Sequence, residues 1–351
     1  MKNLKNKFQD IHYSRQKASF CLGCVLGLGE FFYSKIIKIK NFLYEINFLK
    51  EFDTKANVIC VGNLTTGGVG KTPIVINLAN ELSKKEKVAI ISRGYGAKLQ
   101  NKTPNVIKDF NEIKFPNGSL CGDEPYQLAK KVSNNTVVIT CRNRKLAIQE
   151  AIIKFGCKTI ILDDGFSNRK VKKTKTIVAI DSKMRFGNNH LLPYGPLREP
   201  ISEIKRASEI ILVNKGDENF NDALIWAKNN FNKPIKVCNM TPKRIYNLQT
   251  KANVLSREKT NAIAFCAIGQ PKQFFDFAKQ FYEIKKEIAF SDHHKYDKDD
   301  IKELIKIAKE NNTNVFITTK KDETKLIELI KNVTNFSFNT LELDIEIKEV
   351  K

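Results

Sequence analysis

The sequence has few of the residues that build zinc sites and disulfide frameworks. Its 351 residues include only four histidines, and most of its eight cysteines lie within apolar segments. Cys21 and Cys24 form a C-x-x-C pair, but no second pair and no suitably spaced histidine accompanies it. These counts disfavour a zinc module or a disulfide-stapled domain, and they indicate buried thiols in a reducing compartment.

Acidic residues are scarce relative to basic ones. The chain has 60 Lys and Arg against 38 Asp and Glu, a net charge of +22, and a pI of about 9.5. Such an excess favours an anionic partner, which could be nucleic acid, an acidic membrane or a phosphorylated substrate. The lysines are spread through nearly every segment, so a scattered, solvated surface explains them equally well. The length favours two domains, and the 42% apolar content supports a sizeable core.

A long uninterrupted hydrophobic run is also missing. The apolar run 18–33 would form about 24 Å of helix against a hydrocarbon core of about 30 Å, and it contains Glu30. No small-residue cleavage site precedes the lysine-rich stretch that follows, which disfavours a signal peptide. We therefore expect residues 1–50 to form a membrane-associated helical segment that lies in or dips into the bilayer surface. The alternative is a packed N-terminal helix of a soluble protein.

The strongest local pattern is an apolar strand at 58–62, a glycine cluster, Gly-Lys-Thr, and then a helical pattern from Thr72 to Ser83. Glycines let backbone N–H groups turn toward a phosphate, and the helix presents its positive end to the same place. Thr65 stands where the usual loop pattern has glycine. The alternative is a glycine-rich turn without a ligand. We predict that nucleotide phosphates are bound by Thr65, Gly67, Gly68, Val69, Gly70, Lys71 and Thr72.

The second half of a nucleotide site follows downstream. The apolar strand 159–162 ends in Asp163 and Asp164, and a carboxylate at such a strand end can hold Mg²⁺ together with the hydroxyl of Thr72. Strands alternate with helices throughout, which predicts a P-loop NTPase-like, mostly parallel α/β sheet flanked by helices over 51–215. A second set of strands and helices predicts a smaller C-terminal α/β domain over 216–351.

Four further segments carry candidate functional residues. Arg93 and Tyr95 follow the strand 88–92, at the sheet edge where ligands bind in open parallel sheets. Asp123 and Glu124 begin a helix, and taken alone they would be N-terminal capping residues. The others are the long Pro- and Gly-containing loop 185–200 with Arg185 and Arg198, the segment Asn214-Lys215-Gly216-Asp217, which matches a guanine-recognition pattern, and the pair His293-His294 beside Asp292.

Taken together, these motifs resemble the bacterial tetraacyldisaccharide 4′-kinases, the lipid A 4′-kinases of Gram-negative envelope synthesis. The resemblance extends from Gly62 to Asp322. It rests on Gly62-Asn63-Leu64-Thr65, Gly67-Gly68-Val69-Gly70-Lys71-Thr72-Pro73, Ser92-Arg93-Gly94-Tyr95-Gly96, Gly122-Asp123-Glu124-Pro125, Asp163-Asp164-Gly165-Phe166, Phe186-Gly187-Asn188, Leu191-Leu192-Pro193, Gly195-Pro196-Leu197-Arg198-Glu199-Pro200, Asp292-His293-His294, Thr318-Thr319 and Lys321-Asp322.

The resemblance implies transfer of the γ-phosphoryl group of ATP, with Mg²⁺, to the 4′-hydroxyl of a tetraacylated glucosamine disaccharide 1-phosphate. It implies Asp123 as general base, His293 as its partner and Lys71 as the phosphate-binding lysine. Thr72, Asp163 and Asp164 would serve the metal, and the candidate substrate contacts are Tyr95, Arg93, Glu124, Arg198 and Glu199. It further implies an anionic glycolipid substrate at the cytoplasmic face of the inner membrane, without nucleic acid or an obligate protein partner.

The chain departs from the family pattern in three places. Ser167 and Asn168 replace the usual Gln-His, Asn189 replaces a glycine, and Lys320 replaces a glutamate. The main rival interpretation is a P-loop GTPase or metallochaperone in which residues 214–217 recognise guanine and the histidines hold a metal. A third is a nonenzymatic nucleotide-binding membrane protein. The first leaves the motifs at 122–125 and 191–200 and the N-terminal segment without a purpose, and a candidate base opposite the phosphate site disfavours the second.

Overall fold

The computed structural model describes residues 10–13, 16–94, 97–99, 102–116, 118–217, 219–254, 259–269, 271–291 and 294–350. The chain divides into two compact units. The first contains residues 1–238 and 347–351, and the second contains residues 239–346. The domain limits expected at 50/51 and 215/216 stay predictions.

The first unit is built on a mostly parallel sheet. Its strand order is β7-β6-β1-β5-β2-β4-β3, and β3 alone among these pairs antiparallel, with β4. The inner strands are short apolar runs buried on both faces, as parallel strands covered by helices must be. The strands span Asn57–Gly62 (β1), Val88–Ser92 (β2), Asn105–Lys108 (β3), Thr136–Thr140 (β4), Thr159–Asp163 (β5), Lys175–Asp181 (β6) and Glu209–Asn214 (β7).

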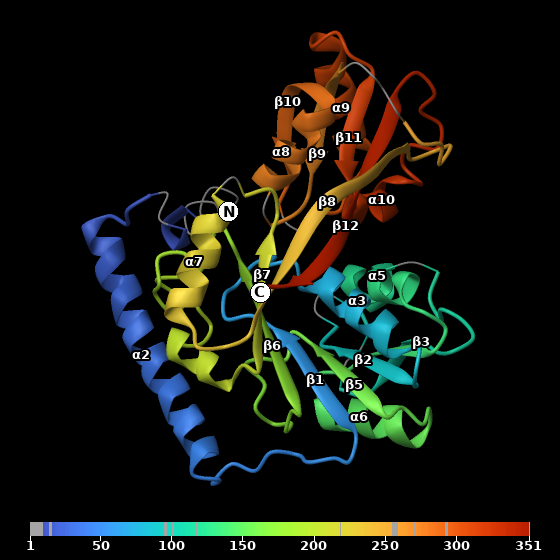
Figure 1. Cartoon of the computed structure of the whole chain (residues 1–351). Coiled ribbons are helices and arrows are strands. Elements are labelled where there is room, and N and C mark those ends of the chain that lie inside the picture. The colour runs from blue at the N-terminus through green and yellow to red at the C-terminus, as the bar shows by residue number, and fades with distance from the viewer. Residues whose placement is uncertain are drawn as a thin grey trace. The chain divides into compact units, whose positions relative to one another are not determined.

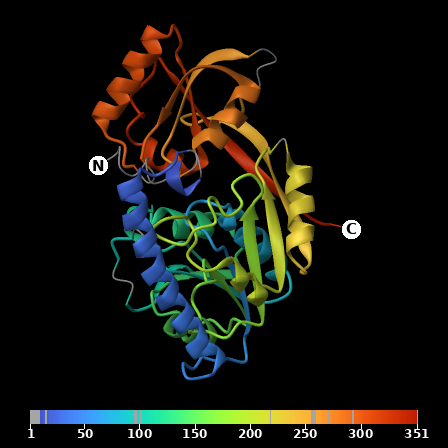
Figure 2. The same ribbon diagram turned by 90° about the vertical axis from the view of Figure 1, so that its left-hand side faces the viewer.

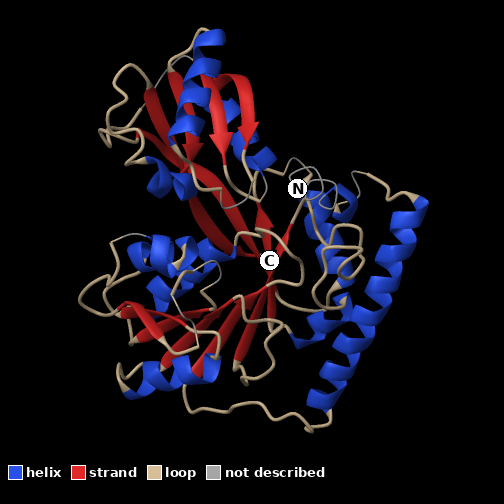
Figure 3. Ribbon diagram, turned by 180° about the vertical axis from the view of Figure 1, so that it is seen from behind, coloured by secondary structure: helices blue, strands red, loops and turns tan. Residues whose placement is uncertain are grey.

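Helices cover both faces of this sheet (Figure 1; Figure 3). The helices α3 (Lys71–Leu82) and α5 (Asp123–Lys131) lie on one face, and α6 (Arg144–Ile153) lies on the other. The remaining helical segments are α4 (Gly118–Cys121), the 3₁₀ helix η1 (Ile201–Arg206) and α7 (Phe220–Asn230). Because β1, β2 and β5 are parallel neighbours, their carboxyl ends meet at one edge of the sheet.

Helix α2 (Phe20–Glu45) runs along the outside of the first unit (Figure 2). Its inner face contacts the long loop before η1: Glu30 accepts hydrogen bonds from the Leu191 amide at 2.7 Å and lies 2.8 Å from His190 Nδ1. The outer face exposes apolar side chains, namely Phe20, Val25, Leu28, Phe31, Phe32, Ile36, Ile39 and Phe42. This is the one helix among the described residues that is long and apolar enough to cross a membrane. The carboxylate that interrupts the apolar run therefore faces the protein, and the exposed face of α2 carries apolar side chains together with Lys35 and Lys38.

In the second unit the strands follow the order β10-β9-β11-β12-β8, and an aromatic core packs against them. Phe265, Phe316 and Phe338 meet at its centre, where the Phe316 and Phe338 rings stack with centroids 4.6 Å apart. Its elements are β8 (Ile235–Asn247), β9 (Thr260–Cys266), α8 (Pro271–Phe281), β10 (Tyr282–Ala289), α9 (Lys298–Glu310), β11 (Val315–Thr319), α10 (Lys320–Leu326) and β12 (Ser337–Glu349). The predicted α/β class with a mostly parallel sheet is confirmed.

Candidate active site

The phosphate loop connects β1 to α3 with the backbone that its glycines allow. Gly67 and Gly70 adopt left-handed conformations, with φ of 104° and 96°. A Cβ atom at Gly68 would meet nothing within 4 Å, so the backbone there is open to a ligand. Thr65 keeps a negative φ and is buried, and its carbonyl and hydroxyl oxygens accept hydrogen bonds from Asn63 Nδ2. Its conformation does not require the glycine of the usual pattern.

Lys71 is the first residue of α3, and its ammonium group lies beside two oxygen atoms across the loop. Its Nζ donates to Asn63 Oδ1 at 2.8 Å and lies 3.4 Å from Asp164 Oδ1. The lysine is thus held at the positive end of the helix, next to the strand-end aspartates. A phosphate bound by the loop would meet this charge directly.

The two strand-end aspartates lie in different electrostatic environments. Asp163 ends β5 opposite Val61 of β1, and burial raises the pKa of its carboxyl group to about 7. Asp164 has a φ of 53° and turns toward Lys71 and Arg198. Burial opposes its ionisation, but those two cations outweigh it and hold the pKa of Asp164 well below its usual range. The buried Asp163 carboxylate is the one that a further cation would stabilise.

Arg198 reaches the same place from the long loop before η1. Its guanidinium donates to both Asp164 oxygens at 2.9 Å, to Asn63 O at 2.9 Å and to Asn63 Oδ1 at 2.5 Å. Backbone hydrogen bonds fix the loop to the phosphate loop, from the Thr66 amide to Pro196 O and from the Arg198 amide to Leu64 O, both at 2.7 Å. A second cation, supplied by a distant segment, is therefore fixed beside Lys71.

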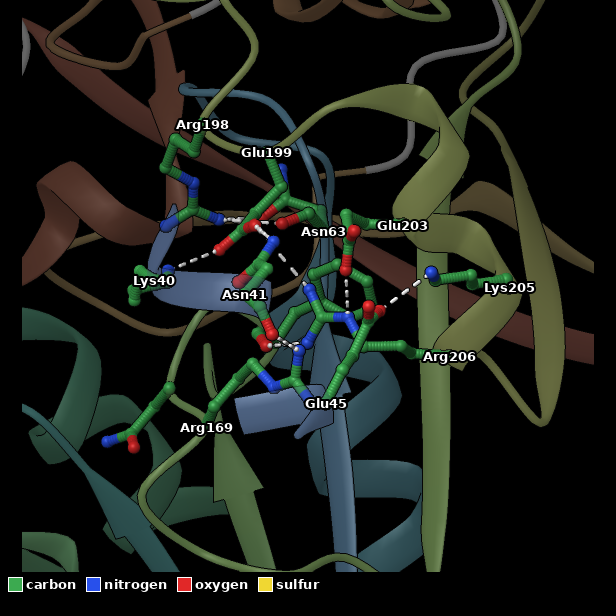
Figure 4. A network of polar contacts seen from close by, with 12 residues as sticks. Lys40, Asn41, Glu45, Asn63, Arg169, Arg198, Glu199, Glu203, Lys205 and Arg206 are labelled. Atoms are coloured by element: carbon green, nitrogen blue, oxygen red, sulfur yellow. Dashed lines mark hydrogen bonds and ion pairs between the residues drawn. The ribbon is translucent and has the colours of Figure 1, made fainter. Parts of the chain in front are cut away.

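Glu199, the next residue, makes its polar contacts with Lys40 and Asn41 (Figure 4). Its side chain is fully buried and accepts hydrogen bonds from Lys40 Nζ and Asn41 Nδ2, both at 3.0 Å, and Arg206 lies 3.6 Å away. Lys40 and Asn41 belong to α2. The structure thus places Glu199 as an internal anchor for that helix, and its predicted substrate contact stays a prediction.

Asp123 and Glu124 begin α5 directly after Gly122, whose φ is 94°. A Cβ atom at Gly118 would lie 3.1 Å from Asp123 Oδ1, so α4 packs closely on this carboxylate. Glu124 is exposed, and its charge contributes to the raised pKa of Asp163. Arg93 follows β2 and is close enough to Arg144 for their charges to repel. Glu124 is thus close enough to influence Asp163, and Arg93 is close to Arg144, which contacts the same aspartate. Tyr95 and His293 lie outside the described residues.

Two cations that the sequence analysis did not assign to the phosphate site contact its backbone. Arg144 is buried at the start of α6, donates to Cys141 O at 2.6 Å and to Asp163 O at 3.4 Å, and feels the charge of both aspartates. Lys215 donates to Gly68 O at 2.7 Å and to Asp181 Oδ2 at 2.8 Å. The sequence does contain a signal for Arg144, because this basic residue begins a helix that follows an inner strand.

The guanine-recognition pattern at 214–217 makes local contacts instead. Asn214 Oδ1 accepts hydrogen bonds from the Gly216 and Asp217 amides, and Asp217 Oδ1 accepts one from the Asn219 amide. Since Lys215 also has its ammonium group buried against Asp181 and the phosphate loop, these side chains have structural roles in closing the turn after β7.

Replacing Lys215 should weaken nucleotide binding, because its ammonium group fixes the carbonyl of Gly68 in the phosphate loop. We expect Lys215→Met, combined with Asp181→Asn so that no buried carboxylate is left alone, to weaken ATP binding by about 5- to 30-fold, corresponding to about 1–2 kcal/mol. Equilibrium titration with a fluorescent ATP analogue measures this. Lys233→Met removes a lysine from an exposed hydrogen bond and should leave the affinity unchanged. Equal affinities for the two variants would contradict the assignment.

The second histidine of the His293-His294 pair and the remaining family motifs lie in the second unit. His294 Nε2 lies 2.7 Å from Asp300 Oδ2, and its ring stacks on Phe290. Asp322 is fully buried and accepts hydrogen bonds from the Ala267 amide and the Thr319 hydroxyl at the start of α10. Within the described ranges, no group of three or more His, Cys, Asp and Glu side chains could hold a metal. His294 thus pairs with a carboxylate in the first turn of α9, the helix that follows it.

The fold and this site define a P-loop phosphotransferase: a parallel sheet, a glycine loop with its lysine, and paired aspartates on the neighbouring strand. The family model for tetraacyldisaccharide-1-P 4′-kinases matches residues 23–351, and the chain belongs to this family. The predicted recognition, enzyme class and place in lipid A biosynthesis are thereby confirmed.

Individual relatives agree with this assignment. The tetraacyldisaccharide 4′-kinase of Halothermothrix orenii is 33% identical, with 92% of this chain and 88% of the relative aligned. That of Elusimicrobium minutum is also 33% identical, over 89% of this chain and 84% of the relative. The crystal structure of LpxK from Aquifex aeolicus, described as an "apo" form in complex with ATP, superposes with a TM-score of 0.71 at 29% identity and covers 93% of this chain and 95% of its own.

Proposed function

We propose that this protein transfers the γ-phosphoryl group of ATP to the 4′-hydroxyl of a tetraacyldisaccharide 1-phosphate. The observation that carries the proposal is the cluster of Lys71, Arg198 and the two strand-end aspartates at the opening of the glycine loop. Phosphoryl transfer spreads negative charge over the transferred group, and fixed cations beside the phosphate loop stabilise that charge.

In this proposal the loop amides and Lys71 bind the β- and γ-phosphates. Binding of ATP would draw Lys71 and Arg198 away from Asp164, because the phosphates offer them more negative charge than one carboxylate does. Asp123, at the start of α5, accepts the proton of the attacking hydroxyl, and His293 orients it. Arg93, Tyr95 and Glu124 contact the substrates, together with Arg198. For Glu199 we propose a positioning role through α2 and keep a substrate contact as the alternative.

The residues present fit a magnesium ion. Thr72, Asp163 and Asp164 supply only hard oxygen donors, and the buried Asp163 carboxylate, whose pKa is raised to about 7, is a group that a cation would stabilise as the anion. Two carboxylates and one hydroxyl leave coordination positions for nucleotide phosphates and water, which is the usual arrangement for Mg²⁺ in phosphoryl transfer. When bound, the ion would neutralise charge on the β- and γ-phosphates.

The decisive test incubates the purified protein in detergent with Mg²⁺, labelled ATP or GTP, and a tetraacyldisaccharide 1-phosphate. We expect label from ATP on the lipid. Nucleotide hydrolysis with a strong preference for GTP and no labelled lipid would refute the proposal and favour the GTPase alternative. Omitting Mg²⁺ and adding a chelator should abolish the transfer.

We also propose that α2 seats the protein on the cytoplasmic face of the inner membrane, where ATP and a lipid acceptor are both accessible. Support comes from the row of exposed apolar side chains on α2 and from the net charge of +22, which favours anionic lipid.

Polar substitution on the outer face of α2 should weaken membrane binding. For the triple change of Phe32, Ile36 and Ile39 to Gln, we expect at least a 10-fold lower partition onto anionic vesicles, since each side chain would lose about 1.5–3 kcal/mol of apolar burial. Sedimentation with the vesicles measures the partition. The control changes Ile153 and Ile225 to Gln, because these are exposed on other helices. Equal partition of the two variants would show that another surface binds lipid.

A further inference from the structure

A basic pocket lies in the first unit, and no residue of the phosphate loop lines it. It is an open depression of about 710 Å³ between the end of α2, the start of α6 and the segment that follows the strand-end aspartates. One acidic residue, Glu51, lines it, and this residue is 3.7 Å from Arg169. Six basic residues line what we call the basic pocket: Lys50, Lys102, Arg142, Arg144, Lys145 and Lys170.

Arg144 joins the basic pocket to the active site. It is 95% buried, since its exposed fraction is 5%, and it lines the pocket while donating to the backbone oxygen of Asp163. Its Nη1 and Nη2 atoms have partners, but its buried Nε atom has no hydrogen-bond partner within the part of the chain that the structure describes. A buried guanidinium with an unpaired N–H group is costly unless a ligand completes its hydrogen bonds.

The start of α6 adds to the positive potential of the pocket. Asn143 caps this ten-residue helix by accepting a hydrogen bond from the Lys145 amide at 3.2 Å, and Asn143, Arg144 and Lys145 all line the depression. The helix therefore directs its positive end to the place where the basic side chains gather. The positive end of the helix and the basic side chains would both favour binding of an anion in the pocket.

The rest of the lining suits a ligand larger than a free ion. Tyr44, Leu49 and Phe52 form an apolar wall, and Lys145 lies over the Phe52 ring with its Nζ 5.2 Å from the centroid. The volume lies within the range of about 300–1,000 Å³ that is usual for small-molecule sites. A sugar ring carrying a phosphate presents this combination of an anionic group and an apolar face.

We infer that the basic pocket binds a phosphomonoester, and that this group is the 1-phosphate of the acceptor disaccharide. The inference rests on the proposed function. The acceptor carries one phosphate before the reaction, whereas the cations of the phosphate loop are required by the nucleotide. Recognition of the acceptor's phosphate therefore needs a second set of cations. Arg144 belongs to this set, and its guanidinium group lies next to Asp163. The cations occupy a depression and include a buried arginine, which suits a single phosphate better than a flat membrane surface.

The test compares two acceptors, the tetraacyldisaccharide 1-phosphate and the same lipid without the phosphate. Each is assayed with the wild-type protein and with a double variant that combines Arg142→Ala and Lys102→Ala. Both substituted residues are exposed, line the pocket and lie outside the proposed catalytic group. We expect kcat/KM for the phosphorylated acceptor to fall about 10- to 100-fold for the double variant, and kcat/KM for the dephosphorylated acceptor to change less than 2-fold. The control, Lys154→Ala, lies on the same part of the chain but outside the pocket and should change neither.

Other outcomes would overturn the assignment. Unchanged rates on both acceptors, or an equal loss on both, would contradict binding of the 1-phosphate. If the double variant loses affinity for vesicles that contain an anionic phospholipid but keeps its preference for the phosphorylated acceptor, the pocket binds a lipid headgroup instead. Calorimetric titration with glucosamine 1-phosphate, without nucleotide, tests the pocket independently of turnover. Weaker binding by the double variant would support the site even if no kinase activity is found.

Discussion

Lys71→Ala should reduce kcat/KM for phosphoryl transfer roughly 100- to 5,000-fold, a loss of about 3–5 kcal/mol of transition-state stabilisation. The ammonium group of Lys71 is held at the first turn of α3, within 3.4 Å of Asp164 and beside the opening of the glycine loop. It is therefore beside the loop before the nucleotide arrives, and on ATP binding it only has to exchange Asp164 for the phosphates, so it can stabilise the charge that develops on the transferred group. Steady-state kinetics with varied ATP measures the loss.

The fold should survive this change, because Arg198 still compensates the charge of Asp164 through two hydrogen bonds at 2.9 Å. A melting temperature close to that of the wild type would verify this. Lys84→Ala provides the matched control, since Lys84 follows the same helix but pairs with Glu81 on the surface. Near-normal turnover by Lys71→Ala would mean that the loop does not bind the transferred phosphate.

Asp123→Asn should retain ATP binding but lose transfer to the lipid by about 10²- to 10⁴-fold, the usual contribution of a general base. The amide keeps the shape of the side chain, so its packing against Gly118 should be preserved. It cannot accept the proton of the attacking hydroxyl. Single-turnover transfer of label to the lipid, measured alongside an ATP titration, separates the chemical step from nucleotide binding.

A helix-capping role for Asp123 predicts a different result. Loss of a favourable charge at the start of α5 would lower stability by about 0.3–1 kcal/mol and leave turnover intact. Asp222→Asn serves as the control, because Asp222 is also an acidic residue in the first turn of a helix of the first unit, α7. If both variants show the same small loss of stability and normal turnover, Asp123 is only a capping residue.

The local parts of the site could be predicted from the sequence because each depends on neighbouring residues. The glycine loop, the lysine at the helix start and the aspartates at the end of an apolar strand each follow from one short segment. By contrast, the position of Arg198 against Asn63 and Asp164 depends on how a distant loop packs. The same packing decides that Arg198, and not Glu199, contacts the site. No pattern in the sequence distinguishes these two adjacent residues.

Strands that form continuous apolar runs could be predicted from the sequence, whereas partly exposed strands could not. The inner strands of the first unit are continuous apolar runs, so they were recognised within a residue or two. Strand β12 was missed, although Leu341, Leu343, Ile345 and Ile347 alternate with polar residues as expected of a half-exposed strand. Strand β8 extends to Asn247; its middle part is polar and partly exposed, so no continuous apolar run marks its full length, although Ile245 and Tyr246 near its end are buried.

The different contacts of Arg198 and Glu199 have a consequence for how the enzyme meets its substrate. Arg198 is bonded to the phosphate loop, and the next residue is bonded to Lys40 and Asn41 of α2 (Figure 4). A single peptide unit thus connects the apolar helix to the site of chemistry. If α2 rests in the bilayer surface, its orientation there sets the height and tilt of the phosphate loop above the lipid headgroups. The membrane would then act as part of the alignment of the two substrates.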